Sequence, residues 1–498
     1  MKNVSKSVYM QYLKCPKMMW YNLHGFERVI SESTQRTLDN GIEFGIMAQK
    51  YFGDFVVVSP DKDESMVEQT LNHLKNGALN IAEATFVDKG GYCQIDILHK
   101  NENNMYDIVE VKSTSTVKPH YIDDIAYQYY VTKDLIPVEH CYILHINNEY
   151  RRMGELTNDL FELEDVTKKA VEKLTPKIKK TAKKSEQVDP NKDLIGEAIR
   201  DILFINDNDV PTIKVHSRCD DQWECPFMND CIKTLEPEEQ ELMACLDLSW
   251  KQRIKCLEKK EMVYPKGKEV LTMKDDEVIC DKDKIKEFLS TLSYPVYLLD
   301  FESIQNIVPQ YDYQKPWQQT PFQYSLHIVN SPDDIELVHK EFLWTEESDP
   351  RPALTKQLLE DIPRGSCVVA YNMMFEKMII KDLAAIYPHY SEHLMEIHDN
   401  CIDLMIPFKN HHYYKGDMRA SYSIKQVLPS CFPDDPSLNY HNLEEVQNGS
   451  MAQDKYLELI KMNDSPEKNR LIHNMLKYCK LDTYAMYKLL IFLYEVSK

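Results

Sequence analysis

Four acidic residues in the second half of the chain have the types and spacing needed to hold metal ions for phosphoryl transfer. They are Asp300, Glu302, Glu376 and Asp482, and Tyr478 lies four positions before the last of them. Asp300 and Glu302 are two apart on a predicted strand and therefore point the same way. Tyr478 and Asp482 share one face of a predicted helix. Such carboxylates can bind two Mg²⁺ or Mn²⁺ ions about 4 Å apart, which stabilise the attacking and leaving oxygens of an in-line displacement. Tyr478 would position the attacking water.

A second candidate site combines carboxylates with a lysine in the first half of the chain. Glu110 and Lys112 lie on the same face of a predicted strand, and Asp96 lies on the neighbouring strand of the same predicted hairpin. Gln128 follows in a predicted helix. The carboxylates would hold Mg²⁺, and the lysine would orient the attacking water and stabilise developing charge. This set predicts metal-assisted cleavage of a phosphodiester bond.

Three cysteines spaced six positions apart, Cys219, Cys225 and Cys231, predict a third centre. Clustered thiols in a reducing compartment bind metal more often than they form disulfides. A tetrahedral metal site or a cubane cluster needs a fourth thiolate, and Cys15 is the expected one because Cys15-Pro16 repeats the context of Cys225-Pro226. The wide spacing favours a 4Fe-4S cluster, with zinc as the alternative.

The composition limits the functions that this chain can have. It has 498 residues, 43% of them hydrophobic, and its 59 basic and 80 acidic residues give a formal net charge of −21. Such a chain can form large cores, but it cannot bind nucleic acid through a generally positive surface. A segment from Val166 to Ser185 with eight lysines and one acid is the candidate phosphate track, or else a solvated face.

Targeting and motor signals are missing from the sequence. The first ten residues lack a signal-peptide core, and no run approaches the ~18 apolar residues of a membrane helix. A cytoplasmic protein without membrane contact is therefore expected. The sequence also lacks the glycine-rich loop of Walker ATPases, so a helicase or a defence protein is expected only as a separate partner.

The elements that must position these residues divide the chain into three parts. Residues 1–235 mix helices and strands, residues 236–290 predict a helical linker, and residues 291–498 begin with a buried strand. The site residues fall on predicted strands at 91–98, 106–112, 296–302 and 368–372, on a helix that includes 375–379, and on a long C-terminal helix. An α/β class is therefore predicted on both sides of the linker.

Residues 1–235 resemble the RecB-like PD-(D/E)XK nucleases, especially the AddB-like proteins and CRISPR-adaptation exonucleases that carry an iron–sulfur cluster. The resemblance rests on Asp96, Glu110, Lys112 and Gln128 and on one early and three late cysteines. It implies a restriction-endonuclease-like fold in which Asp96 and Glu110 bind metal, Lys112 is the catalytic lysine and Gln128 is the family's helix glutamine. It also implies that Cys15, Cys219, Cys225 and Cys231 bind a 4Fe-4S cluster. Gln49 stands where the family often has a histidine ligand, on a helix expected over 41–52. The spacing of the last three cysteines also differs from the commonest family pattern.

Residues 291–498 resemble the DnaQ-like DEDD exonucleases of the RNase H-like fold, in the subgroup with a tyrosine in the last motif. Asp300-Phe301-Glu302 is similar to the first motif, Asn372 to Glu376 to the second, and Tyr478 to Asp482 to the third. Glu376 replaces the usual aspartate. Asp403 and Ser423-Ile424-Lys425 are similar to later family positions. The resemblance implies 3′→5′ exonuclease activity with Mg²⁺ or Mn²⁺.

The whole chain resembles a bacterial family of two-nuclease proteins known as a domain of unknown function. The segments that carry this resemblance are Ser5-Lys6-Ser7, Cys15-Pro16-Lys17, Trp20, residues 83–86, residues 294–302, Tyr371-Asn372 and Phe375-Glu376. The prediction is a metal-dependent nuclease that acts on nucleic acid, with DNA favoured over RNA, in repair or phage defence. The alternatives are a nucleic-acid-binding adaptor with a degenerate first site, and an RNA-processing exoribonuclease.

Overall fold

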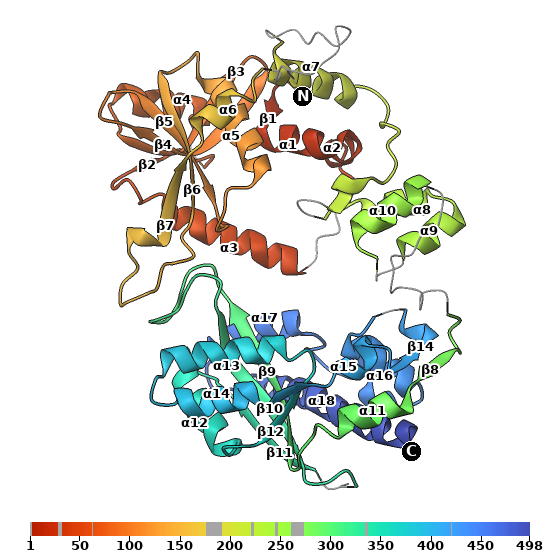
Figure 1. The fold of residues 1–498 in the computed structure, drawn as a ribbon. Coiled ribbons are helices and arrows are strands. Elements are labelled where there is room, and N and C mark those ends of the chain that lie inside the picture. Colours follow the sequence, from red (N-terminus) through yellow and green to blue (C-terminus); the bar gives the residue numbers. More distant parts are fainter. Residues whose placement is uncertain are drawn as a thin grey trace. The chain divides into compact units, whose positions relative to one another are not determined.

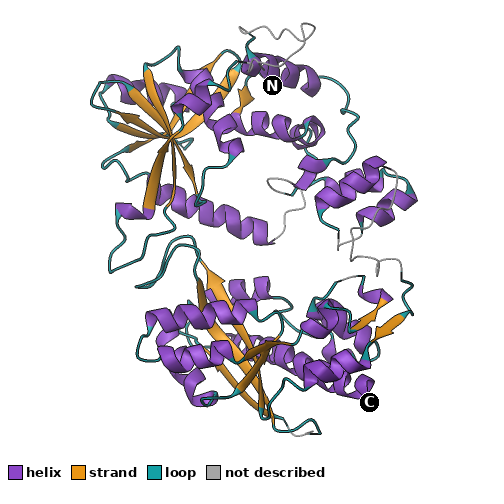
Figure 2. Cartoon of the chain, in the orientation of Figure 1, coloured by secondary structure: helices purple, strands orange, loops and turns teal. Residues whose placement is uncertain are grey.

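The structure is a computed structural model in which two compact units are distinguished. It describes residues 2–27, 32–61, 63–175, 192–220, 224–244, 248–259, 273–333, 337–419 and 421–498, with the backbone alone for 32–37. Unit 1 comprises Met1–Gln240 and Ile307–Trp317, and unit 2 comprises Glu241–Asn306 and Gln318–Lys498. Each unit combines helices with a sheet (Figures 1 and 2), which confirms the predicted mixed α/β class. Most of the predicted lysine track, from residue 176 onward, lies outside the described residues.

Unit 1 is built on one mixed sheet in which β2-β3-β4-β5-β6-β7 are successive neighbours and β1 pairs with β4. Its strands are β1 (Val4–Ser5), β2 (Val56–Val57), β3 (Asn80–Asp88), β4 (Gly91–Lys100), β5 (Tyr106–Lys112), β6 (Val138–Ile146) and β7 (Phe161–Asp165). Strands β3, β4 and β5 are antiparallel neighbours, whereas β5 and β6 are parallel. A parallel pair needs a crossover connection, and helix α5 (Pro119–Thr132) supplies it.

The helices of unit 1 cover both faces of this sheet. Besides α5 they are α1 (Lys6–Lys14), α2 (Pro16–Leu23), α3 (Glu32–Ala48), α4 (Met66–Lys75), α6 (Thr167–Val171), α7 (Leu194–Asn206), α8 (Met228–Lys233) and α9 (Pro237–Met243), which crosses the unit boundary, with 3-10 turns at Asn158–Leu160 and Ser217–Asp220. Helix α3 ends at Ala48, so the helix expected over 41–52 ends earlier and Gln49 lies beyond it.

The alternation of side chains along β5 decides on which face of the sheet the predicted site residues lie. Ile108 packs in the core formed with α1 and α5, whereas Val109 packs in the core formed with Phe44 of α3. Side chains two apart on a strand share a face. Glu110 and Lys112 therefore lie on the face of Ile108, beneath α1 and α5.

A segment from the second half of the sequence completes the core of unit 1. Ile307 is fully buried beside Phe44 and Tyr150, and Trp317 packs against the same cluster. The guanidinium of Arg152 donates to the carbonyl oxygens of Pro309 and Gln310 at 3.0 and 2.7 Å. The chain thus leaves unit 2 after one strand and returns to it before the next.

Unit 2 is built on a five-stranded sheet with the order β11-β10-β9-β12-β13 and a separate two-stranded ribbon, β14-β8. The strands are β8 (Val278–Cys280), β9 (Val296–Gln305), β10 (Gln319–Val329), β11 (Val338–Leu343), β12 (Cys367–Ala370), β13 (Cys401–Asp403) and β14 (Tyr413–Lys415). Strands β9, β10 and β11 are antiparallel, whereas β12 is parallel to both β9 and β13. Strand β8 lies within the predicted helical linker, so this part of the linker belongs to the fold of unit 2.

The helices of unit 2 include the long C-terminal helix that carries the last predicted motif. They are α10 (Trp250–Lys259), α11 (Lys282–Leu289), α12 (Arg351–Asp361), α13 (Met374–Ile386), α14 (Ser391–Asp399), α15 (Ile406–Lys409), α16 (Ile424–Cys431), α17 (Gly449–Leu459) and α18 (Pro466–Ser497), with 3-10 turns at Gly416–Met418, Pro436–Leu438 and Tyr440–Asn442. In the described part of the chain, no helix combines the length and apolar character needed to cross a membrane.

Helix α18 is fixed to β10 by a buried polar network. The hydroxyl of Thr483 lies 2.7 Å from Nδ1 of His327 and 2.6 Å from Oγ of Ser325, which in turn lies 3.0 Å from Nε2 of His339. Burial lowers the pKa of His327 to about 3 and that of His339 to about 4. Both rings are therefore neutral where they support α18.

Acid should weaken this attachment. An unfolded chain protonates both histidines below pH ~6.5, whereas the folded chain resists protonation, so their contribution to stability is complete above that pH and is lost as the pH falls. We expect the free energy of unfolding of wild-type unit 2, relative to that of His327→Gln, to fall by about 2 kcal/mol between pH 7 and pH 5. The exposed His389→Gln is the control and should follow the wild type. Parallel pH profiles of wild type and His327→Gln would contradict the prediction.

Candidate metal-binding sites

Three of the four predicted acids of unit 2 converge in one group. Asp300, Glu302 and Asp482 each place a carboxylate oxygen within 4.8 Å of the other two. Strand β9 is buried on both sides, and α18 packs across it. Asp482 of α18 therefore meets Asp300 and Glu302 of β9, although it is far from them in sequence. A set of three carboxylate oxygens is the donor type that Mg²⁺ and Mn²⁺ prefer.

Glu376, in the first turn of α13, lies near this group but outside the set of three that meets within 4.8 Å. Its side chain is buried, and its Oε2 atom has no hydrogen-bond partner among the described residues. Burial, with Asp403 and Asp482 nearby, raises the pKa of Glu376 to about 8. A buried carboxylate oxygen without a partner is costly unless a proton or a cation satisfies it. The donor set therefore fits a divalent ion.

The pKa values of the other carboxylates of this group are also raised by burial. Burial and the neighbouring acids raise the pKa of Glu302 to about 8 and hold that of Asp300 well above its usual range. Burial also raises the pKa of Asp482 to about 6, although a hydrogen bond from Tyr440 lowers it. Four like charges in one place disfavour full ionisation, which is the electrostatic condition that a bound cation relieves.

Tyr478 is buried on the same face of α18 as Asp482. Burial, followed by the charges of Asp482, Glu302 and Asp300, raises the pKa of Tyr478 far above its usual range. The phenol therefore stays protonated. It can hold a water molecule by hydrogen bonding, but it cannot act as a base.

Sequence reasoning missed two residues of this group and left a third without a role. The hydroxyl of Tyr440 donates to Oδ1 of Asp482 at 2.7 Å, and Sγ of Cys479 lies 3.8 Å from Oδ2 of Asp300. Lys425 lies over the ring of Tyr440, 5.4 Å from its centroid, and its charge lowers the pKa of both Glu302 and Asp482. Cys479 immediately follows Tyr478, but Tyr440 begins a short 3-10 turn without a recognisable sequence motif.

Asp403 serves the backbone in this structure. Its Oδ1 accepts from the backbone amides of Asn372 at 2.9 Å and Met405 at 3.0 Å. Asn372 has a φ of +64°, so this carboxylate holds a left-handed turn between β12 and α13. Asp403 thus fixes the turn that directs α13, and with it Glu376, toward the acids of β9.

In unit 1 the predicted carboxylates are paired with lysines. Glu110 and Asp124 are both buried, and Nζ of Lys112 lies 2.7 Å from an oxygen of each. A second lysine, Lys6, lies 2.8 Å from Glu110 and 3.3 Å from Asp124. Burial would raise the pKa of Asp124, but Lys112 and Lys6 hold it well below its usual range. Two ammonium groups therefore balance two buried carboxylates.

Asp96 and Gln128 complete the predicted set in unit 1. Registered pairing of β4 with β5 ends at Ile97 and Val109, and beyond it Oδ2 of Asp96 accepts the backbone amide of Val111 at 2.7 Å. The amide nitrogen of Gln128 donates to Glu110, while its Oε1 is buried without a partner among the described residues. The structure thus brings together all four residues predicted here.

Lys6 and Asp124 were not predicted for this site. Asp124 lies one helical turn before Gln128 on α5, so the four-residue spacing could have identified it. Lys6 is separated from Glu110 by 104 positions, and no local pattern links the two residues. Gln49, expected near this site, follows the last residue of α3.

The four predicted cysteines approach one another in unit 1. Cys15 begins α2 as its N-cap, and Cys219 and Cys225 are buried and lie within electrostatic range of the other three thiols. The backbone amide of His216 lies 3.5 Å from Sγ of Cys219, a direction suited to a thiolate. No three of these four described sulfur atoms lie within 4.8 Å of one another. That spacing is wider than the about 3.8 Å that tetrahedral zinc imposes on its thiolates.

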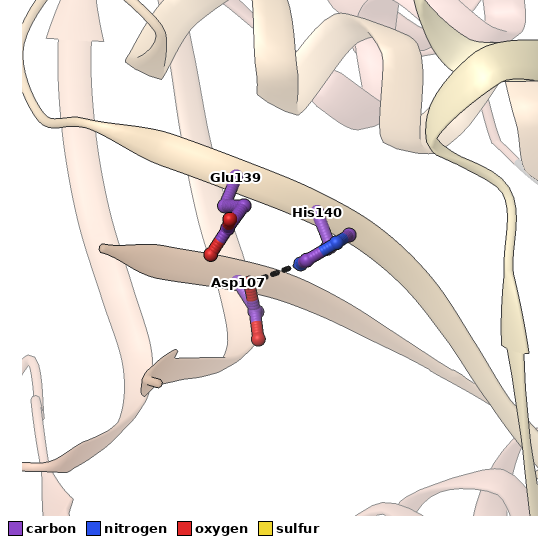
Figure 3. A group of neighbouring side chains, drawn as sticks. All are labelled: Asp107, Glu139 and His140. Carbon is purple, nitrogen blue, oxygen red and sulfur yellow. Dashed lines mark hydrogen bonds and ion pairs between the residues drawn. The ribbon is translucent and has the colours of Figure 1, made fainter. Parts of the chain in front are cut away.

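Asp107, Glu139 and His140 form another group of possible ligand atoms, at the opposite end of β5 (Figure 3). A register shift in the β5–β6 pairing lets both Glu139 and His140 reach Asp107. The amide of Asn101 donates to Asp107 at 2.9 Å and to Glu139 at 2.7 Å, and Nδ1 of His140 lies 3.1 Å from Asp107. These hydrogen bonds satisfy the group internally and tie the β4–β5 turn to β6.

Comparison with known proteins adds a partial family match. Residues 297–423 match a domain of unknown function, DUF2779. The matched range contains Asp300, Glu302, Glu376 and Asp403, and it ends before α18. This agrees with the predicted resemblance to a family of unknown function.

Two curated relatives are similar to part of the chain. The uncharacterized protein MG366 of Mycoplasma genitalium is 25% identical over 233 residues, which are 43% of this chain and 34% of that protein. The uncharacterized protein UU173 of Ureaplasma parvum is 26% identical over 215 residues, 40% of this chain and 31% of that protein. The chain thus spans about a third of the length of these relatives. No solved structure matches.

The two carboxylate groups should respond oppositely to neutralisation. Asp300→Asn removes a charge that repels its neighbours, so we expect it to stabilise metal-free unit 2 by about 1–2 kcal/mol. Glu110→Gln leaves the ammonium groups of Lys6 and Lys112 with one carboxylate, that of Asp124, in place of two, so we expect it to destabilise unit 1 by about 3 kcal/mol. Both stability changes are measured by thermal unfolding in the presence of a metal chelator. Limited proteolysis then shows which unit has unfolded. Destabilisation of unit 2 by Asp300→Asn would show that its acids are already compensated.

Proposed function

We propose that this chain is a metal-dependent nuclease whose principal active site is the acid group of unit 2. The observation that carries the proposal is the convergence of Asp300, Glu302 and Asp482 within 4.8 Å, with Glu376 buried nearby and its Oε2 atom without a hydrogen-bond partner among the described residues. A buried group of acids that forms no ion pair with a lysine in the described part of the chain is costly in free energy, and metal-dependent phosphoryl transfer gives it a use. The proposed reaction is 3′→5′ exonucleolytic hydrolysis of nucleic acid, with DNA favoured.

The topology of unit 2 supports this reaction class. Counted along the chain from β9, the sheet order is 3-2-1-4-5, and the first strand carries the first two acids. This is the arrangement expected of the RNase H-like fold that the motif resemblance implies. The remaining acids come from α13 and from the C-terminal helix, as they do in the DEDD pattern.

The residues of unit 2 divide the chemical tasks among them. Asp300, Glu302, Glu376 and Asp482 hold the divalent ions, which when bound supply an activated water and neutralise charge on the phosphate. Tyr478 keeps its proton and orients the attacking water. Tyr440 fixes one oxygen of Asp482 and leaves the other for a ligand. Lys425 supplies a positive charge close to the anionic substrate.

For unit 1 we propose a PD-(D/E)XK-like module. The run β3-β4-β5-α5-β6, which follows α3 after β2 and α4, supports this proposal, since β3, β4 and β5 are antiparallel and α5 crosses to a parallel β6. Asp96 and Glu110 would bind a divalent ion, and Lys112 would orient the water. The pairing of Lys6 and Lys112 with the carboxylates also favours the second candidate, an adaptor that binds nucleic acid without cleaving it.

We further propose that Cys15, Cys219, Cys225 and Cys231 hold a 4Fe-4S cluster. All four donors are cysteines, and the wide sequence spacing of Cys219, Cys225 and Cys231 supports a cluster over zinc. The cluster would be structural, since its ligands join the first helices of unit 1 to a segment more than 200 positions later. Zinc stays the alternative.

The nuclease proposal predicts a clear result for one substitution. Asp300→Asn should lower Mg²⁺- or Mn²⁺-dependent release of nucleotides from the 3′ end of labelled strands by at least about a thousandfold, because it removes a metal ligand. End-labelled single- and double-stranded DNA and RNA distinguish the substrates. Lys112→Ala tests unit 1 in the same assay.

The outcomes separate the candidates. Cleavage that survives Lys112→Ala unchanged and disappears in Asp300→Asn favours an adaptor role for unit 1. Asp399→Asn, an exposed acid at the end of α14, is the matched control and should retain full activity. Unaltered cleavage by both Asp300→Asn and Lys112→Ala would contradict the nuclease proposal.

The cysteine proposal predicts a coloured protein. Chain purified without oxygen should be brown, with broad visible absorption and about four iron atoms per molecule. Cys225→Ala should lose the iron and make unit 1 sensitive to limited proteolysis, while unit 2 stays intact. Cys256→Ala, a buried cysteine outside the quartet, is the control. A colourless protein with stoichiometric zinc would favour the alternative.

A further inference from the structure

Lys6 occupies the carboxylates that the proposed function of unit 1 assigns to a metal. Its Nζ lies 2.8 Å from Oε1 and 2.9 Å from Oε2 of Glu110, and 3.3 Å from Oδ1 of Asp124. Lys112 takes a second position on Oε1 of Glu110, and Gln128 donates to Oε2. Both oxygens of Glu110 therefore carry two donors each. A divalent ion can bind Glu110 only if one of these donors moves.

The backbone around Lys6 holds it at this position. Strand β1 pairs in parallel with the start of β4, the strand that carries Asp96. Ser5 then caps α1 by accepting the amide of Val8, and Lys6 is the first residue of the helix. One turn later, Tyr9 stacks on Tyr127 of α5 with ring centroids 4.7 Å apart. The backbone of Lys6 is thus fixed between β4, which carries Asp96, and α5, which carries Asp124.

Of the donors to Glu110, Lys6 is the one suited to leave. Gln128 is fully buried, and Lys112 bridges Glu110 and Asp124 from the end of β5 at 2.7 Å to each. The side chains of Lys6 and Lys112 are similarly exposed, at 22% and 20%, but Lys6 holds Asp124 less closely, at 3.3 Å. A long lysine side chain at the solvent edge can swing away without moving the backbone.

We propose that Lys6 is a resident cation of the unit 1 site and that a divalent ion must displace it from Glu110. The inference rests on the proposed metal-dependent function of unit 1. Lys6 keeps the buried acids neutralised when metal is absent and lowers their affinity for metal by charge repulsion and by direct occupation. The released ammonium stays beside the site, where the phosphate of a nucleic acid is its natural partner.

Direct measurement of metal binding tests the proposal without using activity. Full-length chain carrying Asp300→Asn and Asp482→Asn removes the acid group of unit 2 and serves as the background. Binding of Mn²⁺ is followed by the electron paramagnetic resonance signal of the free ion. Lys6→Met and Lys6→Gln should each tighten binding roughly tenfold or more, because a positive charge leaves the site. Lys6→Arg should retain the affinity of the background.

Controls separate displacement from a structural role. Lys169→Met removes the same charge from an exposed ion pair with Glu164 and should change Mn²⁺ affinity less than twofold. Adding Glu110→Gln to Lys6→Gln should abolish the gain. A residue that only held α1 in place would, when replaced, weaken metal binding or leave it unchanged. Lys6→Gln retains a donor toward Glu110, so it keeps the test valid if Lys6→Met unfolds unit 1.

The results distinguish failure of the Lys6 displacement from failure of the proposed metal site of unit 1. If Mn²⁺ binds through Glu110 in the background and Lys6→Gln leaves the affinity unchanged or weaker, displacement is wrong and the metal site stands. If neither the background nor Lys6→Gln binds Mn²⁺ through Glu110, both the displacement and the proposed metal site of unit 1 fail.

Discussion

The free-energy cost of burying carboxylates governs the design of both units. An ionised carboxylate out of water needs a cation, a proton or several hydrogen-bond donors nearby. Unit 1 meets much of this need from within, through Lys6 and Lys112 on Glu110 and Asp124. Burial and the neighbouring acids still raise the pKa of Glu110 to about 7. Unit 2 leaves the need largely unmet, and the raised pKa values of Glu302 and Glu376 record it. The same type of residue thus produces a closed site in one unit and an open one in the other.

A group of buried acids that repel one another persists only where the surrounding fold is stable enough to offset the free energy of that repulsion. In unit 2 the acids sit on β9, which is paired on both sides and buried, and on α18, which packs along the sheet. The network of Thr483, Ser325 and His327 fixes α18 to β10, where Ser325 is the ladder partner of Asp300. Apolar burial and these hydrogen bonds stabilise the scaffold, so that the carboxylates cannot move apart to relieve their repulsion.

Local sequence patterns predicted the elements but only part of each site. Strand alternation located β4, β5 and β9, and four-residue spacing placed Tyr478 with Asp482, because these signals lie within one element. Lys6 and Tyr440 were missed because only the assembled fold brings them to the acids. The end of α3 at Ala48 and the packing of Ile307 in unit 1 are likewise set by tertiary contacts that no local window contains. The mixed α/β class followed from the elements alone.

Helix α1 connects two centres of unit 1 that the sequence treats as separate. Lys6 is its first residue, and Cys15 follows its last, with the amide of Cys15 donating to the carbonyl of Gln11. A helix of nine residues is short and stiff, so a shift at one end is transmitted to the other. Whatever holds Cys15 against Cys219 and Cys225 therefore also determines how firmly the ammonium of Lys6 is presented to Glu110. Helix α1 thus joins the proposed cysteine site to the carboxylates of unit 1.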